Sequence, residues 1–306
     1  MLGDGRSLDG SVDYVRTPPS FPYIPGHDIC GVVVEMPPGD ETFVVGDVVV
    51  TTSKEVLLMG GLAEYSLASI RSSALKPDGL SVESAAASGT SAQRALFVCK
   101  NHVRQGDRVL VLGGSGGFGT YVVQMLKSVS KASFVVATST QTDLLKHLGV
   151  DEVVNYTTTN LWEMKRDIAF DVIIDCCPAT GAHSFRRASK VLKSGWQGGR
   201  FIAVTAENPD MQIHSAWDMM GMMGSLFKYP FITFFRRGIP RYKAFLAGFK
   251  KGHLEETLEL LNTGSVKTVF GPPSPLQFTV EDAKKGFEMV ASKHAHGKIV
   301  IRISES

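Results

Sequence analysis

The sequence has no surplus of charge of either sign. Its 32 basic and 30 acidic residues give a formal net charge of +2. Proteins that bind nucleic acid or an acidic surface normally carry a clear basic excess or a basic patch. The overall charge therefore does not point to a nucleic-acid partner, and we expect none.

Cysteine is scarce, and the four that occur form no regularly spaced framework: Cys30, Cys99, Cys176 and Cys177. A chain of 306 residues can fold without disulfide staples. We therefore expect a reducing compartment and a cytoplasmic protein, with a mitochondrial location as the alternative if a targeting segment is missing. The adjacent pair Cys176 and Cys177 has poor geometry for a disulfide and predicts buried packing rather than redox chemistry.

Long apolar runs are also absent. No stretch of about 20 apolar residues lacks a charge or a proline, so no membrane-spanning helix is predicted. Residues 1–26 have neither the basic start nor the apolar centre of a signal peptide. Residues 219–235 are rich in Met and Phe but contain Lys228 and Pro230. We expect them to line a buried cavity or a subunit interface, with contact at a membrane surface as the alternative.

Glycine is abundant, with 31 residues, and it forms the strongest motif in the chain. Gly114, Gly116 and Gly119 satisfy G-x-G-x-x-G, directly after an apolar strand and directly before a helix, which is the context that the motif requires. The first glycine permits a tight turn, the second lets the backbone approach a pyrophosphate, and the third lets the helix pack closely. The alternative is a glycine-rich turn that binds nothing. The predicted phosphate-binding residues are Gly114, Ser115, Gly116, Gly117, Phe118 and Gly119.

Apolar strands and helices alternate around this loop. Strands with few polar residues, separated by helices, indicate a parallel sheet that is covered on both faces. Right-handed crossovers then give a doubly wound α/β fold of the Rossmann type. The predicted strands are residues 108–114, 134–139, 152–156, 170–177 and 200–206.

The two ends of the chain have a different sequence pattern from the nucleotide-binding region. Residues 26–70 contain short β-branched runs between glycine and proline turns, which suggests a small barrel-like domain. The predicted strands there are 32–35, 47–52 and 63–67. A final strand at 298–303 has no helix after it, so we expect it to return to the first domain's sheet. We predict a β-rich domain from residues 1–84, an inserted nucleotide-binding domain from 85–262, and a return to the first domain over 263–306.

The residues after the second strand of the nucleotide domain bear on the choice of dinucleotide. An NAD site usually has Asp or Glu there. This chain has Thr138, Ser139, Thr140 and Gln141, and its first acid is Asp143. Hydroxyls in place of a carboxylate remove repulsion against a 2′-phosphate, so NADPH is favoured over NADH. Turn and N-cap chemistry explains the same hydroxyls without a ligand.

The order of these segments resembles that of the medium-chain dehydrogenase/reductases, in their zinc-independent quinone oxidoreductase-like branch. The likeness runs from about residue 21 to residue 302. It implies a split GroES-like catalytic domain made by both chain ends, with the nucleotide domain inserted between them, and a homodimer. The matching segments are Pro25–Asp28, Gly31–Val33, Val45–Val49, Gly61–Tyr65, Ala85–Ala86, Gly89–Ser91, the glycine loop, Leu148–Tyr156, Phe170–Asp175 and Gly297–Ile301.

The resemblance also implies roles for single residues. Ser139 corresponds to a hydroxyl near the 2′-phosphate, and Tyr156 to a tyrosine along the adenosine ribose-phosphate. Ser91 corresponds to a Thr or Ser near the nicotinamide. The alternatives are an ordinary strand-end tyrosine and a helix hydroxyl that bonds back to its own backbone. Gln141 stands where some members have a lysine that pairs with the 2′-phosphate, which weakens the preference for NADPH.

A zinc site is not expected. His27 beside Asp28 resembles a ligand segment of the family's zinc branch, but that branch takes further ligands from cysteines. Ala87 stands at one of these cysteine positions, and no cysteine precedes His27. Without a metal, an activated alkene or quinone needs only hydrogen-bond donors for the charge that develops on its oxygen. Tyr65 and His27 are weak candidates for this pocket, and no residue stands out as the proton donor.

The resemblance implies an NADPH-dependent, zinc-free reductase of quinones, enones or similar conjugated carbonyl compounds. A zinc-free alcohol or aldehyde oxidoreductase is one alternative, and a nucleotide-binding protein with little catalysis is another. The last alternative depends on the start of the chain. The family begins with earlier strands and an Asn-x-x-Asp segment beside the substrate, which this sequence lacks. We expect the missing strands to lower stability and turnover while nucleotide binding persists.

Overall fold

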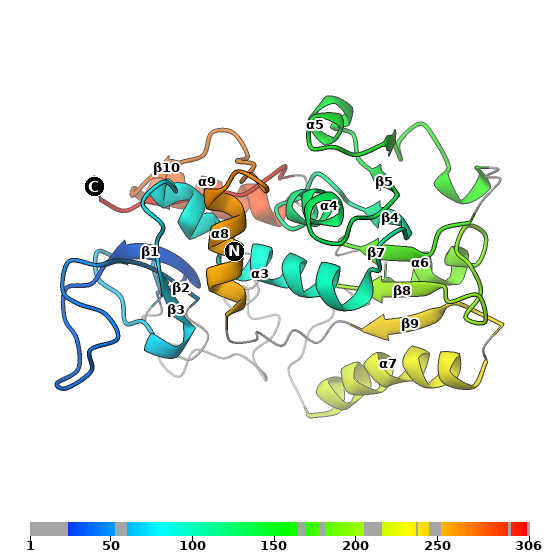
Figure 1. Cartoon of the computed structure of the whole chain (residues 1–306), viewed down its shortest axis with the longest axis horizontal. Coiled ribbons are helices and arrows are strands. Elements are labelled where there is room, and N and C mark those ends of the chain that lie inside the picture. The colour runs from blue at the N-terminus through cyan, green and yellow to red at the C-terminus, as the bar shows by residue number, and fades with distance from the viewer. Residues whose placement is uncertain are drawn as a thin grey trace. The chain divides into compact units, whose positions relative to one another are not determined.

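The protein is described by a computed structural model whose placed residues form two compact units. One unit combines residues 1–94 with 249–306, and the other spans 95–248. Helix α3 (Val82–His102) crosses from one unit to the other, so the predicted boundary at 84/85 falls inside a helix (Figure 1). The predicted domain limits stay a prediction. The structure describes residues 24–52, 60–164, 169–177, 181–204, 216–236, 238–244, 252–292 and 295–304.

The second unit contains a six-stranded parallel sheet in the order β6-β5-β4-β7-β8-β9. The chain starts at the centre of the sheet, winds outward to β6, and then returns to add β7, β8 and β9 on the other side. This order confirms the predicted doubly wound fold. The strands are β4 (Arg108–Leu112), β5 (Phe134–Thr138), β6 (Glu152–Val154), β7 (Val172–Asp175), β8 (Arg200–Ala203) and β9 (Arg241–Ala244).

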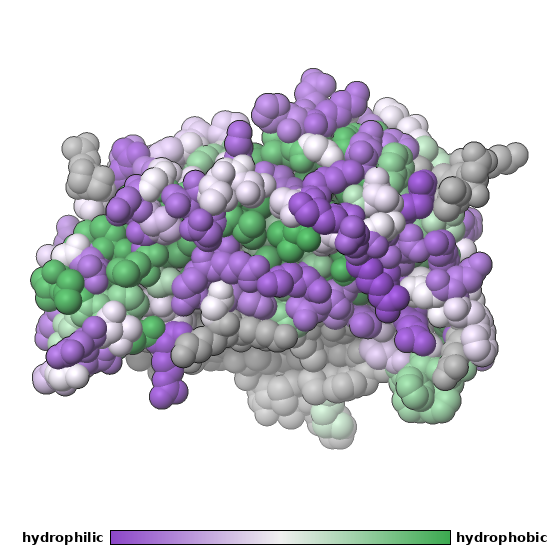
Figure 2. Space-filling view, viewed as in Figure 1, coloured by the Kyte–Doolittle hydropathy of each residue, from purple (hydrophilic) through white to green (hydrophobic). Residues whose placement is uncertain are grey.

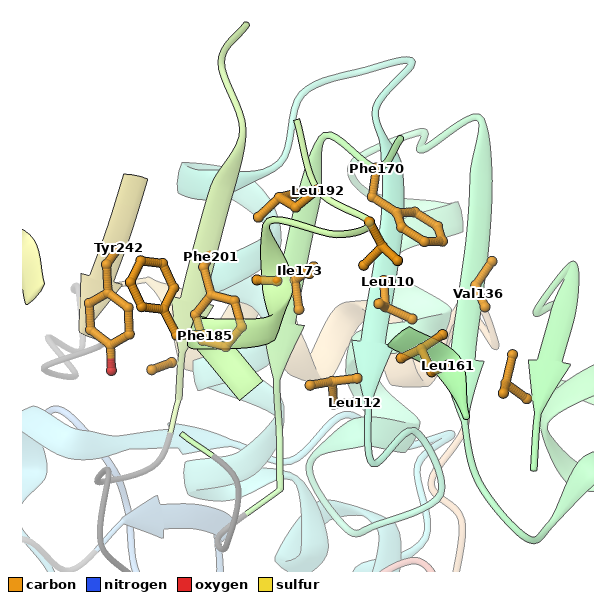
Figure 3. Close-up of a cluster of buried hydrophobic side chains, with 14 residues drawn as sticks. Leu110, Leu112, Val136, Leu161, Phe170, Ile173, Phe185, Leu192, Phe201 and Tyr242 are labelled. Atoms are coloured by element: carbon orange, nitrogen blue, oxygen red, sulfur yellow. The ribbon is translucent and has the colours of Figure 1, made fainter. Parts of the chain in front are cut away.

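The apolar strands supply the core of this unit because the sheet is buried on both faces. Leu110, Ile173 and Phe201 are fully buried on three neighbouring strands. Figure 3 shows the aromatic end of the cluster, where the ring centroids of Phe185 and Tyr242 lie 4.9 Å apart. Burial of such large side chains contributes about 1.5–3 kcal/mol each. The helices of this unit are α4 (Gly119–Ser128), α5 (Thr142–His147), α6 (Gly181–Ala188) and α7 (Ala216–Phe235), with a short 3-10 turn η2 (Leu161–Glu163).

The Met- and Phe-rich segment forms α7, which packs along β9. The Tyr229 and Tyr242 rings are 5.3 Å apart at this contact. At the C-terminal end of α7, Phe231, Phe234 and Phe235 are 66%, 71% and 68% exposed. Figure 2 shows the apolar colour at this end of the helix. The predicted cavity wall or interface stays a prediction. Within the described part of the chain, no helix is long and apolar enough to span a membrane.

The first unit contains an antiparallel sheet of β1 (Asp28–Val32), β2 (Val48–Thr52) and β3 (Ser73–Leu75), as expected of GroES-like β structure. The strand predicted at 47–52 is confirmed, whereas the one predicted at 32–35 begins four residues earlier, at Asp28, and ends at Val32. The strand predicted at 63–67 is wrong. Residues 61–65 form a bend, and just before the predicted strand the backbone amides of Gly60, Gly61 and Leu62 bond to carbonyls of residues 24–26.

The C-terminal segment of this unit contains α8 (His253–Asn262), β10 (Leu276–Gln277), α9 (Val280–Ala291) and β11 (Ile301–Arg302). A short 3-10 turn, η1 (Ile70–Ser72), precedes β3. The last strand pairs in parallel with β10 rather than with the β1–β3 sheet, so the predicted pairing is wrong among the placed residues. The Leu276 amide donates to the Val300 carbonyl at 2.8 Å, which holds the last strand against β10.

Candidate functional site

The glycine loop lies where the sequence predicted it, between β4 and α4. β4 is the strand at which the order of the sheet reverses, with β5 on one side and β7 on the other. Ligands of open α/β sheets bind at the carboxyl end of the strands at such a reversal. The fold therefore presents the loop at the place where a dinucleotide is expected.

Three of the glycines are required by the protein itself. Gly113 has a φ of 76°, which disfavours any other residue. A Cβ at Gly119 would lie 2.2 Å from the Gly113 carbonyl oxygen, and one at Gly114 would lie 2.8 Å from the Ala137 Cβ. These positions therefore explain the turn and the close packing of helix on strand that the motif predicts.

Gly116 differs from its neighbours. Its φ lies outside the left-handed region, and the nearest heavy atom to a Cβ there would be the Gly113 carbonyl oxygen at 3.8 Å. The described structure has room for a side chain at this position. Glycine at 116 is thus explained by the close approach of something outside the chain, which fits a pyrophosphate.

A second feature of the loop fits the same ligand. The hydroxyl Oγ1 of Thr120, in the first turn of α4, is buried and has no hydrogen-bond partner among the placed residues. The amide of Thr120 donates to the Gly116 carbonyl at 3.0 Å. A buried hydroxyl without a partner is costly, and a bound anion at the helix start would satisfy it.

The end of β5 holds the loop in place. The amide of Gly113 donates to Thr138 Oγ1 at 3.0 Å, and the amide of Gly114 donates to the Thr138 carbonyl at 3.1 Å. Ser139 Oγ donates to Ser115 Oγ at 2.7 Å and accepts from the Gln141 amide at 2.8 Å. Thr138 and Ser139 therefore support the loop as well as standing at the predicted ribose end.

Tyr156 follows β6, which is the neighbour of β5, so the sheet brings it to the same edge as Ser139. It is 56% exposed, and its ring is open to a ligand. The structure thus gathers the glycine loop, Thr138, Ser139 and Tyr156 at one edge of one sheet.

The end of β7 adds residues that the sequence interpretation did not assign. Asp175 is fully buried, and its Oδ1 accepts from the Cys177 amide at 3.1 Å. A Cβ at Gly113 would lie 2.6 Å from Cys177 Sγ, so this strand end touches the loop. Burial first, and then the neighbouring Cys177 and Asp175, raise the pKa of Cys176 well above its ordinary value. An acid inside an apolar strand was the available signal for Asp175.

In the first unit, Ser91 on α3 belongs to a small polar cluster. Lys298 Nζ donates to Ser91 Oγ at 3.0 Å. The same Nζ lies 3.8 Å from Asp28 Oδ2, while Asp28 Oδ1 accepts from the Thr90 amide at 2.8 Å and from the Thr90 hydroxyl at 2.6 Å. The sequence interpretation identified Ser91 only. Asp28 and Lys298 stand in segments that carry the family resemblance, but nothing in the sequence indicated that they meet.

The remaining candidates are less well supported. Tyr65 lies in the bend before β3 and is 69% exposed. His27 is half-buried directly before β1. Across the described ranges, no three or more His, Cys, Asp or Glu side chains are grouped so that they could hold a metal ion. The predicted absence of zinc stays a prediction.

Two family models match the chain. Residues 5–78 match the alcohol dehydrogenase GroES-like domain, and residues 148–301 match the zinc-binding dehydrogenase family. The chain is 29% identical to an NADPH-dependent alkenal/one oxidoreductase of Arabidopsis thaliana, over 97% of this chain and 68% of the relative. It is 30% identical to a 2-methylene-furan-3-one reductase of Solanum lycopersicum, over 94% of this chain and 66% of that relative. The chain spans about two thirds of the length of both relatives.

Solved structures show the same fold at lower identity. A quinone oxidoreductase from Coxiella burnetii superposes with a TM-score of 0.77 at 22% identity, covering 98% of this chain and 86% of that one. The Escherichia coli quinone oxidoreductase complexed with NADPH superposes with a TM-score of 0.74 at 18% identity, covering 99% and 88%. With its GroES-like sheet, its doubly wound sheet and its glycine loop, the chain belongs to the medium-chain dehydrogenase/reductase superfamily, in its quinone oxidoreductase-like branch.

Proposed function

We propose that the protein reduces a quinone, an enone or a similar conjugated carbonyl compound with a hydride from NADPH, and that it does so without zinc. It is an NAD(P)H-dependent oxidoreductase of the quinone reductase type.

The free space beside Gly116 is the main support for a bound dinucleotide. Gly116 is a glycine that the protein does not need for its own packing, in a loop at the reversal point of the sheet. Loop amides and the amino end of α4 bind phosphates through N–H donors and the helix dipole. Thr120, with its unpaired hydroxyl, is a further donor for the same anion.

The ribose end supports NADPH over NADH. Ser139 and Gln141 stand after β5, and residues 139–142 include no Asp or Glu that would accept from ribose hydroxyls or repel a 2′-phosphate. Tyr156 offers an exposed ring at the same edge. We assign Ser91 to the nicotinamide end, which rests on the family resemblance.

The acceptor class is supported by the names of the two relatives. Both names describe compounds in which a carbon–carbon double bond is conjugated with a carbonyl group. Bound NADPH supplies a hydride, which such an acceptor takes up at carbon. The protein has to hold the acceptor, exclude water and place hydrogen-bond donors at the oxygen where charge develops. None of these tasks needs a metal.

Acceptors of three chemical classes test the proposal. The loss of NADPH absorbance is followed with a quinone, an enone and an aldehyde, each with and without a chelator. We expect turnover with a quinone or an enone that the chelator does not change. Turnover with the aldehyde alone would favour the alternative of an alcohol or aldehyde oxidoreductase. Loss of activity in the chelator would contradict the zinc-free proposal. Tight binding of NADPH with no turnover on any acceptor would contradict the enzymatic proposal.

We also propose that the protein is cytoplasmic and forms a homodimer. Some relatives carry chloroplastic or mitochondrial names. Fractionation of cells that express the protein tests the location, and sedimentation of the purified protein tests the dimer.

A further inference from the structure

Asp28 and Thr90 build a rigid support beside Ser91. Asp28 Oδ1 accepts two hydrogen bonds from Thr90, one from the amide at 2.8 Å and one from the hydroxyl at 2.6 Å. The carboxylate comes so close to α3 that a Cβ at Gly89 would lie 2.5 Å from Oδ1. Gly89 therefore has to be glycine for Asp28 to reach the helix backbone. Residue 91 follows directly, so its position is fixed by these contacts.

Lys298 approaches the hydroxyl of Ser91 more closely than it approaches the carboxylate. Its Nζ is 3.0 Å from Ser91 Oγ and 3.8 Å from Asp28 Oδ2. A lysine whose purpose was the ion pair would be expected to donate directly to the carboxylate. Asp28 is close enough to balance the charge, while the hydrogen bond itself goes to the neutral oxygen. The Lys298 and Asp28 side chains are only 17% and 18% exposed, so this charge is poorly screened.

The direction of this hydrogen bond determines what Ser91 can do. An ammonium group has only donors, so Ser91 Oγ must accept from Lys298. The Ser91 hydroxyl hydrogen is therefore directed away from Lys298 and can be donated to a third group. A hydroxyl that accepts from a cation is a stronger donor to a third group, because the hydrogen bonds polarise one another.

We propose that Lys298 supplies, through the Ser91 hydroxyl, the proton that the reduced acceptor takes up at its oxygen. The inference rests on the proposed function. The hydride and its electron pair form a C–H bond at the far carbon of the conjugated system, and the double-bond electrons move toward the carbonyl oxygen. That oxygen takes the proton of Ser91, Ser91 takes a proton from the Lys298 ammonium, and Lys298 takes one from water. The acceptor is reduced by two electrons, and the net proton comes from the solvent.

Substitutions at the two residues test the relay. In Lys298→Met and in Ser91→Ala, kcat should fall by about 100-fold or more, which is the usual contribution of general acid catalysis. The dissociation constant of NADPH should stay within about threefold of wild type. Ser91→Thr keeps the hydroxyl and should retain most of the activity. Ser91→Ala removes only one oxygen atom, so it should fold even if a Lys298 variant does not. Its kcat then still tests the relay.

Two further readouts separate proton supply from a structural role. Arg in Lys298→Arg keeps the charge and the donors but does not release a proton near neutral pH, so its kcat should be as low as that of Lys298→Met. In Lys298→Ala, added methylamine should raise kcat in proportion to its concentration, because the free amine replaces the missing one. A Lys298→Arg variant with wild-type kcat, or a Lys298→Ala variant that methylamine does not rescue, would overturn the relay.

Arg302 offers a matched control. Its guanidinium donates to Glu83 at 2.5 Å, so it also ties the C-terminal segment to α3, as Lys298 does. Arg302→Met should keep kcat close to wild type. An equal loss in Arg302→Met and Lys298→Met would show that the loss comes from loosening this segment, and would overturn the relay. A wild-type enzyme that is active on an enone while Lys298→Met is equally active rejects the relay and leaves the proposed function intact. A wild-type protein inactive on every acceptor rejects both.

Discussion

The hydroxyl of Ser139 donates a 2.7 Å hydrogen bond to the hydroxyl of Ser115. One residue stands after β5 and the other lies in the glycine loop, and both are nearly fully buried. Ser139 also accepts from the Gln141 amide at 2.8 Å. A single hydroxyl therefore links the phosphate loop to the turn where the 2′-phosphate of NADPH is expected. A substitution at Ser139 should therefore affect both the phosphate loop and the turn at which the 2′-phosphate is expected.

Ser139→Ala should weaken the binding of NADPH by about tenfold. The substitution removes both hydrogen bonds of the Ser139 hydroxyl, the one to Ser115 Oγ and the one from the Gln141 amide, so the glycine loop and the turn after β5 lose this link. Fluorescence titration measures the affinity. Ser133→Ala is the matched control, because Ser133 precedes the same strand and donates to the Gly106 carbonyl at 2.7 Å, away from the loop. An equal loss of affinity in both variants would contradict a specific role for Ser139.

Gln141→Lys should tighten the binding of NADPH and leave NADH unchanged. Gln141 is exposed next to Ser139, and a lysine there would place a positive charge near the expected 2′-phosphate. We expect a gain of about fivefold at low salt that shrinks as salt is added, since exposed charges are screened. Gln141→Glu should have the opposite effect. If titrations show NADH affected as strongly as NADPH, the 2′-phosphate does not lie at this turn.

Gly116→Ala and Gly119→Ala should fail for different reasons. A Cβ at Gly116 has room in the protein, so Gly116→Ala should keep the wild-type melting temperature but lose most of its affinity for NADPH. A Cβ at Gly119 would lie 2.2 Å from the Gly113 carbonyl oxygen, so Gly119→Ala should lower the melting temperature itself. Thermal unfolding and NADPH titration of both variants give the comparison. Unchanged NADPH affinity in Gly116→Ala would remove the main support for the dinucleotide site.

The nucleotide-binding unit was predictable because its signals are local. The glycine loop follows β4 and opens α4 within twelve consecutive residues, 108–119, and the apolar strands are continuous in sequence. β9 was missed because it lies at the edge of the sheet. Arg241 and Lys243 are exposed while Tyr242 between them is buried, so residues 241–243 contain no apolar run to recognise. At residues 63–67 a strand was predicted where the structure has none. Alternating apolar and polar residues form a strand only where a partner strand is available.

The Ser91 cluster was not predictable in this way. Lys298 lies 207 positions from Ser91, and Thr90 lies 62 positions from Asp28. No period or spacing links such residues. The Asp28–Thr90 contact joins β1 to α3, and the Lys298–Ser91 contact joins the C-terminal segment to α3. The resemblance to a family pointed to Ser91, but the residues that support it came from the structure.

His102, at the end of α3, carries a pH-dependent part of the stability. Burial first, and then the positive charges of Lys243 and Arg200, lower its pKa from 6.5 to about 4. The folded protein therefore favours the neutral imidazole more strongly than the unfolded chain does. The stability that this provides is fully present above pH 6.5 and is lost as the pH falls from 6.5 toward 4.

Replacing His102 should remove this acid sensitivity. The wild-type melting temperature should fall by about 2–4 °C between pH 7 and pH 4.5, which corresponds to roughly 1 kcal/mol for a half-exposed group in a chain of this size. His102→Gln, which does not titrate, should show a smaller fall over the same interval. Asp171 does not confound the measurement. Burial raises its pKa, but the hydrogen bonds from Lys193 and the Arg108 amide, together with the charges of Lys193 and Arg200, outweigh burial and keep the pKa below 3.8, so its contribution is lost at lower pH. Equal falls in wild type and His102→Gln would show that other groups titrate in this interval.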